Sequence, residues 1–122
     1  MESLNTKFRD YTRDLALQVI KELSPLPYTD AVGVVRKQII RSVTSVAANY
    51  RASCRARSQR ERYAKMCIVV EEADETLFWL EMIESMELID PNTLSSLKSQ
   101  AEEIVKVMSS YRKSLKPKSR YK

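Results

Sequence analysis

Apolar residues recur at steps of three or four positions along four segments of this chain. The first repeat comprises Phe8, Tyr11, Leu15, Val19 and Leu23, and the second Val32, Val35, Ile39, Val43, Val46, Tyr50 and Cys54. The third comprises Tyr63, Met66, Val70, Ala73, Leu77 and Leu80, and the fourth Leu94, Leu97, Ala101, Ile104, Met108, Tyr111 and Leu115. Because this spacing matches the turn of an α-helix, it predicts four amphipathic helices.

Residues that favour helix starts stand before each repeat. They are Asn5 or Thr6, then Thr29 or Asp30, then Ser58 with Glu61 in capping-box spacing, and finally Asp90 followed by Pro91. Pro25 and Pro27 end the first helix. We expect the second helix to run to about Arg57 and the third to end between Met86 and Leu88.

Short connections between long helices make neighbouring helices antiparallel. With one Gly and four Pro in 122 residues, the composition also suits a few long helices. The sequence therefore predicts an all-α fold, an antiparallel up-down four-helix bundle over residues 1–115 with packing angles near 20°. Residues 116–122 form a basic tail that we expect to be flexible.

The third repeat is more apolar than one buried face requires. Large side chains occupy residues 66–70 and 77–80 around most of the helix, whereas a surface helix keeps one polar face. Neighbouring helices of the monomer could cover all of them. We favour self-association, with Phe78 and Trp79 at the interface.

Charge is distributed unevenly along the chain, although the net charge is only +5. Residues 36–65 contain nine basic residues and one acid, and residues 71–90 contain eight acids and no base. In an up-down bundle the connection between the second and third helices lies at the same end as both termini. One end should therefore be cationic, and the opposite end, with Glu22, Asp30, Glu81, Glu84, Glu87 and Asp90, anionic.

The cationic end is a candidate phosphate-binding surface, because arginine guanidinium groups match phosphate oxygens two at a time. Its candidate nucleic-acid-binding residues are Arg51, Arg55, Arg57, Arg60, Arg62, Lys65, Arg112 and Lys113. The alternative is a solvated surface that binds nothing. No base-reading motif accompanies these cations, so binding would be to the RNA or DNA backbone, with low sequence specificity.

Several chemistries lack the residues they need. There is no His, there are only two Cys, Cys54 and Cys67, and Gly33 is the one Gly. A thiol or imidazole metal site, a His-based active site and a glycine-rich phosphate loop are therefore not expected. The sequence predicts a protein that is not an enzyme and has no cofactor and no metal. No run of apolar residues approaches the length of a membrane span, and we expect a cytoplasmic location.

Two stretches resemble a known family. Residues 41–51, RSVTSVAANYR, with CRARS at 54–58, resemble the signature of bacterial four-helix-bundle proteins first noticed as products of ribosomal RNA intervening sequences. Residues 71–81, EEADETLFWLE, resemble the third helix of that family. Ala52 and Ser53 depart from its usual acidic then small pair, which removes an acid beside Arg51.

That family includes the accessory variability determinant proteins of diversity-generating retroelements. The resemblance implies a ring-like homopentamer that binds RNA and DNA and associates with a reverse transcriptase. An oligomeric protein-protein interaction scaffold without nucleic-acid binding is the alternative. Asn49 lies near the buried face, where a hydrogen-bonded polar side chain could fix helix register, and we expect it to be structural.

Overall fold

The computed structural model describes residues 3–117 and contains four α-helices in sequence order. They are α1 (Leu4–Leu23), α2 (Asp30–Cys54), α3 (Gln59–Ser85) and α4 (Pro91–Leu115). In the described range no residue lies in a β-strand. The all-α four-helix prediction is therefore confirmed, and α4 ends at the predicted domain limit. Of the predicted basic tail, residues 118–122 lie outside the described residues.

Three of the four predicted helix starts are correct. The side chains of Thr29, Ser58 and Asp90 accept hydrogen bonds from backbone N–H groups in the first turns of α2, α3 and α4. The prediction for α1 is wrong, because Asn5 and Thr6 already lie inside the helix. Its cap is Ser3, whose Oγ accepts from the Thr6 N–H at 3.1 Å. Every helix thus begins where a short polar side chain satisfies a free N–H group.

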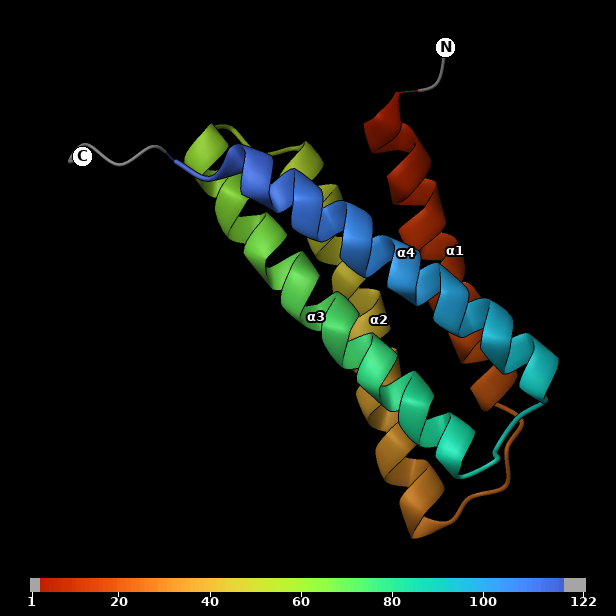
Figure 1. Cartoon of the computed structure of the whole chain (residues 1–122). Helices are drawn as coiled ribbons and strands as arrows, with labels where there is room; N and C mark the ends of the chain where they lie inside the picture. Colours follow the sequence, from red (N-terminus) through yellow and green to blue (C-terminus); the bar gives the residue numbers. More distant parts are fainter. Residues whose placement is uncertain (1–2, 118–122) are drawn as a thin grey trace.

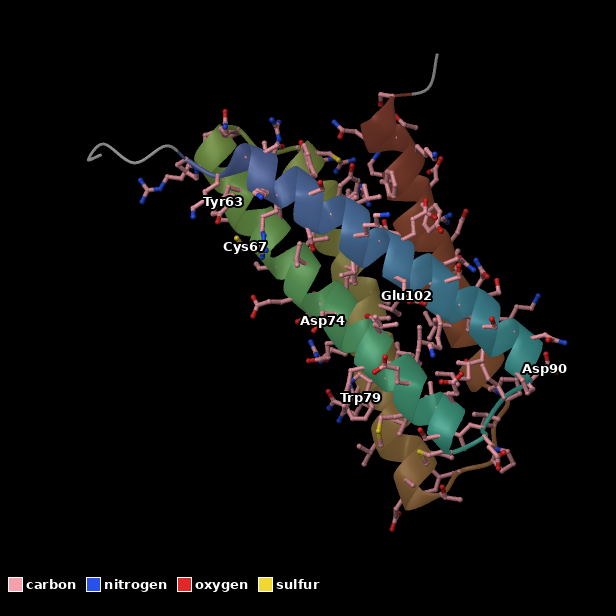
Figure 2. The ribbon with its side chains drawn as sticks, in the orientation of Figure 1. Tyr63, Cys67, Asp74, Trp79, Asp90 and Glu102 are labelled. Atoms are coloured by element: carbon pink, nitrogen blue, oxygen red, sulfur yellow. The ribbon has the colours of Figure 1, made fainter. Side chains whose placement is uncertain are left out.

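The second helix is shorter than the sequence suggested. It stops at Cys54 instead of Arg57, because the N–H groups of Arg55 and Ala56 turn back to the carbonyls of Ala52 and Ser53. This tight turn brings α3 back alongside α2. Both described ends of the chain and the α2–α3 connection lie at one end of the molecule, which we call the terminal end (Figure 1). The α1–α2 and α3–α4 connections lie at the other end, near Asp90 (Figure 2).

The apolar side chains of the predicted repeats in α1, α2 and α4 form the core between the helices. Ile39, Val46, Leu97 and Ile104 are among its buried members. On α3 three positions of the predicted repeat, Tyr63, Val70 and Leu77, are only half-buried and pack against the edge of the core, as Tyr11, Cys54 and Tyr111 do on the other helices. The buried positions there are Met66, Val69, Ala73, Thr76, Leu80 and Ile83. The sequence pattern had passed over Thr76 because it is polar.

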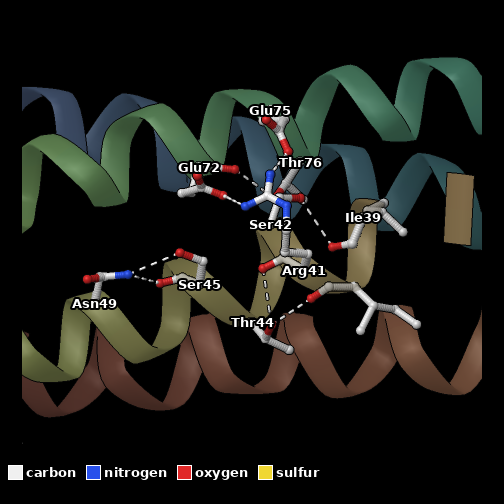
Figure 3. Close-up of polar contacts among 10 residues, drawn as sticks. Ile39, Arg41, Ser42, Thr44, Ser45, Asn49, Glu72, Glu75 and Thr76 are labelled. Carbon is white, nitrogen blue, oxygen red and sulfur yellow. Dashed lines mark hydrogen bonds and ion pairs between the residues drawn. The ribbon is translucent and has the colours of Figure 1, made fainter. Parts of the chain in front are cut away.

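A hydrogen-bonded pair explains why a polar residue occupies that core position. The Thr76 hydroxyl has a single proton, which it shares between the Oγ of Ser42 at 2.9 Å and the carbonyl of Glu72 in its own helix at 2.8 Å. Ser42 donates to the Ile39 carbonyl at 3.2 Å, and both side chains are buried (Figure 3). Two short side chains let α2 and α3 approach closely, and their hydrogen bonds offset the cost of burying them.

The contact between α1 and α4 is the least extensive of the four helix pairings, and polar side chains mark it. The Tyr11 hydroxyl donates to Oε2 of Glu103 at 2.8 Å, and Gln18 and Gln100 exchange hydrogen bonds at 3.2 and 3.3 Å. Partial burial, then the neighbouring Glu103 carboxylate, raises the pKa of Tyr11 to about 12.

Replacing Tyr11 with Phe should cost about 1 kcal/mol of stability at neutral pH, because the hydrogen bond to Glu103 is removed. The pKa of Tyr11 is higher in the folded chain than in the unfolded one, so its contribution is complete below pH 10 and declines as pH rises toward 12. The difference in urea midpoint between Tyr11→Phe and the unmodified protein should therefore shrink over that interval. A difference that grows with alkaline pH would contradict this.

Candidate nucleic-acid interface

The structure divides the basic residues of the 36–65 stretch into those with intramolecular partners and those without. Arg36 donates to the carbonyls of Leu23 and Leu26 at 3.0 and 2.8 Å and so holds the α1–α2 connection. Arg41 pairs with Glu72 at 3.1 Å and with Glu75, which links α2 to α3 (Figure 3). The contacts of these two arginines within the chain therefore stabilise the fold.

Arg62, one of the predicted phosphate-binding residues, also makes a hydrogen bond within the chain. Its Nε donates to the Ser53 carbonyl at 3.2 Å, at the C-terminal end of α2. A cation there pairs with an otherwise free carbonyl and with the negative end of the helix dipole. The side chain is half-buried, so Arg62 positions α3 against α2 and is less available to a ligand than its neighbours.

Four other arginines at this connection are exposed. They are Arg51, Arg55, Arg57 and Arg60. Within residues 3–117 none of them has a carboxylate within ion-pair distance, since the ion pairs found there involve only Arg41 and Lys98 as cations. The predicted arginine cluster is therefore present at the terminal end, and its charge faces solvent.

Arg51 and Arg55 line an open groove of about 480 Å³ between α1 and α2, which we call the α1/α2 groove. Arg9 and Arg13 of α1 line it too, with Asp10 as the single acid. The candidate residues chosen from the sequence include neither Arg9 nor Arg13. The sequence pattern that could have identified Arg13 is a pair of arginines four residues apart, which occurs both at Arg9 and Arg13 and at Arg51 and Arg55.

A second cationic surface lies between α3 and α4. Lys106, Arg112, Lys113 and Lys116 surround a groove of about 580 Å³ with Tyr63, and we call it the α3/α4 groove. Arg60 lines a separate hollow with Gln59 and Pro117. Arg112 and Lys113 share no groove with Arg51 and Arg55. The candidate residues therefore line grooves on two different helix pairs of the bundle, α1 with α2 and α3 with α4.

Lys65 and Asn49 have different surroundings from those expected. Lys65 lies half-buried on α3 and lines neither groove. Asn49 donates to the carbonyl and the hydroxyl of Ser45 at 2.9 and 3.0 Å, both within α2 (Figure 3). These hydrogen bonds reach no other helix, so they have no direct part in fixing helix register.

Phe78 and Trp79, neighbours on α3, differ in how far they are exposed. The Phe78 side chain is 49% exposed, whereas Trp79 is half-buried and packs against the core (Figure 2). The rings meet edge to face with centroids 4.9 Å apart. The Trp79 Nε1 is buried and has no hydrogen-bond partner among the described residues. Of the two, Phe78 is the residue that offers apolar surface to a second molecule.

Both cysteines are free thiols in half-buried positions, Cys54 at the end of α2 and Cys67 in α3 beside Tyr63 (Figure 2). A hydrogen bond to Cys67, followed by partial burial, raises the pKa of Tyr63. In the part of the chain that the structure describes, no three Cys, Asp or Glu side chains gather as metal ligands would. None of the helices there combines the length and apolar character of a membrane span.

Comparison with known proteins places this chain in a family. Its fold is similar to that of a protein of unknown function from the S23 ribosomal protein family of Bacteroides thetaiotaomicron VPI-5482. The two are 30% identical, with a TM-score of 0.80 over 89% of this chain and 97% of the other. No curated protein matches the chain. Residues 5–110 match the family described as 23S rRNA-intervening sequence protein, and the chain therefore belongs to that family.

Proposed function

We propose that this protein is a non-catalytic, oligomeric accessory protein that binds the backbone of RNA and DNA through the arginines at its terminal end. The exposed cluster of Arg51, Arg55, Arg57 and Arg60 carries this proposal. It places four exposed guanidinium groups between the last turn of α2 and the first turn of α3, with no ion pair to the described part of the chain. Phosphate oxygens are its natural counter-charge.

The electrostatic repulsion among these exposed arginines favours binding of a ligand that carries negative charge. Arg51 and Arg55 are one helical turn apart, and like charges at that spacing destabilise a helix by a few tenths of a kcal/mol. A polyanion would remove this repulsion and release its own condensed counterions, which favours binding at low salt. The family name, which refers to ribosomal RNA, agrees with a nucleic-acid partner.

Self-association belongs to the same proposal. Ile68, Phe78 and Met82 are exposed along α3, and α3 carries acids between them. A ring-like homopentamer would cover these side chains and repeat the arginine cluster five times. Several weak phosphate contacts would then act together through a high effective concentration. A reverse transcriptase is the protein partner that the resemblance to retroelement accessory proteins suggests, and the assembly would work in the cytoplasm.

The test is the salt dependence of binding. Fluorescence anisotropy with unrelated RNA and DNA oligonucleotides should show affinities that depend little on sequence and fall steeply as salt rises. Arg55→Ala combined with Arg57→Ala should lower the affinity and flatten the plot of log affinity against log salt. For duplex DNA the slope should decrease by about two units for each protomer that contacts the duplex, one for each phosphate that the variant no longer neutralises.

A matched control removes two exposed cations at the opposite end. Lys21 lies in the last turn of α1 and Lys37 in the N-terminal third of α2, and replacing both with Ala changes the net charge equally. This variant should keep nearly the whole slope. If the unmodified protein binds no oligonucleotide even at low salt, the proposal fails, and a scaffold that binds only protein takes its place.

A further inference from the structure

The α1/α2 groove combines a charged rim with an apolar floor. We call its four lining arginines, Arg9, Arg13, Arg51 and Arg55, the rim, and its apolar lining residues Leu17, Ile20, Ala47 and Ala48 the floor. Thr44 points toward α1, whereas Arg41 points toward α3, so the groove lies on the side of α2 away from the ion pairs (Figure 3).

The rim has an unbalanced charge. Two arginine pairs, each separated by one helical turn, flank the groove with Asp10 as the only acid beside them. Arg9 makes a weak hydrogen bond to the Thr6 hydroxyl at 3.4 Å, and none of the four arginines pairs with a carboxylate in residues 3–117. An occupant that brings at least two negative charges to the rim would relieve this repulsion.

The floor requires an occupant with apolar surface as well. Leu17 is 49% exposed although it lies between two helices, so its side chain is available for contact. The groove volume falls within the range of about 300–1,000 Å³ that is typical of small-ligand sites, which is enough for a nucleotide.

We infer that the α1/α2 groove binds single-stranded RNA or DNA, with phosphates on the arginine rim and an unstacked base on the apolar floor. This inference rests on the proposed function and adds a preference to it. A duplex keeps its bases paired inside and offers only phosphates to the groove, so it cannot use the floor. A single strand exposes both groups, and arginine guanidinium planes stack on bases as well as bind phosphates.

The experiment compares a single-stranded oligouridine with a duplex RNA that carries the same number of phosphates. Anisotropy at one fixed salt concentration should give at least tenfold tighter binding to the single strand. Leu17→Gln keeps every charge but makes the floor polar. It should weaken single-strand binding about tenfold, in the range found when one base no longer packs on its side chain, with an unchanged salt slope and unchanged duplex affinity.

Val34→Gln is the matched control, because Val34 is an exposed aliphatic residue of α2, 57% accessible, that does not line the groove. It should leave both affinities unchanged. Equal binding of both RNAs that is insensitive to Leu17→Gln would overturn the groove while leaving phosphate binding intact. Absence of binding to either RNA would instead overturn the proposed function as well.

Two other occupants are distinguished by the same variants. Vesicles containing anionic phospholipid that bind in a Leu17-dependent manner, without single-strand binding, would assign the groove to lipid and contradict the inference. Loss of the oligomer on Leu17→Gln would show that a second copy covers the groove, and would contradict it too. Displacement of bound oligouridine by free uridine monophosphate at high concentration, with the single-strand preference retained, would support it.

Discussion

Val69→Asp is expected to unfold the protein at room temperature, whereas Val70→Asp should leave it folded. Val69 has no exposed surface and sits among the buried side chains of α3, so an aspartate there must be buried without a partner. That costs several kcal/mol, against a total stability of about 5–15 kcal/mol for a typical domain. Val70 is half-buried, and an aspartate at that position can reach water.

Circular dichroism would measure this difference. The spectrum of Val69→Asp should show reduced helix content and no cooperative thermal transition, and that of Val70→Asp a native spectrum with a lowered midpoint. The pair is matched in chemistry and differs by one position on the helix. A larger loss of stability for Val70→Asp than for Val69→Asp would show that a different face of α3 is buried in the core. It would also contradict the hydrogen bond between Thr76 and Ser42, which depends on that face.

Phe78→Glu is expected to convert the proposed pentamer to monomers. The unmodified protein should have a mass near 70 kDa, five times the 14.1 kDa of one chain. Phe78 is half exposed on α3, and burial of its ring against a second copy would contribute about 1.5–3 kcal/mol at each interface. A buried glutamate would add an opposing desolvation cost, so association should weaken by orders of magnitude.

Light scattering at micromolar concentration is the measurement, with circular dichroism to confirm that the fold is kept. Leu17→Glu is the control, since Leu17 is also 49% exposed but lies on α1 in the α1/α2 groove. Its mass should equal that of the unmodified protein. A monomer mass for the unmodified protein itself would rule out the oligomer, whatever the variants do.

The sequence alone determined the helices and their order. Caps at Thr29, Ser58 and Asp90 are local, because a side chain reaches an N–H group two or three residues away. The apolar repeats and short connections then left the antiparallel bundle as the economical arrangement. The position of the α2–α3 connection at the terminal end follows from that topology, and so does the gathering of arginines there.

Only the tertiary structure decided the burial and pairing of side chains whose partners lie far away in the sequence. Thr76 takes a core position because Ser42, 34 residues earlier, lies opposite and accepts its hydrogen bond. Arg36, Arg41 and Arg62 are held by groups of other segments, while Arg51 and Arg55 are left to solvent. All five look alike in a basic stretch of sequence. Only the packing of α1 against α2 places two arginine pairs around one apolar floor, since no local pattern encodes a distance between helices.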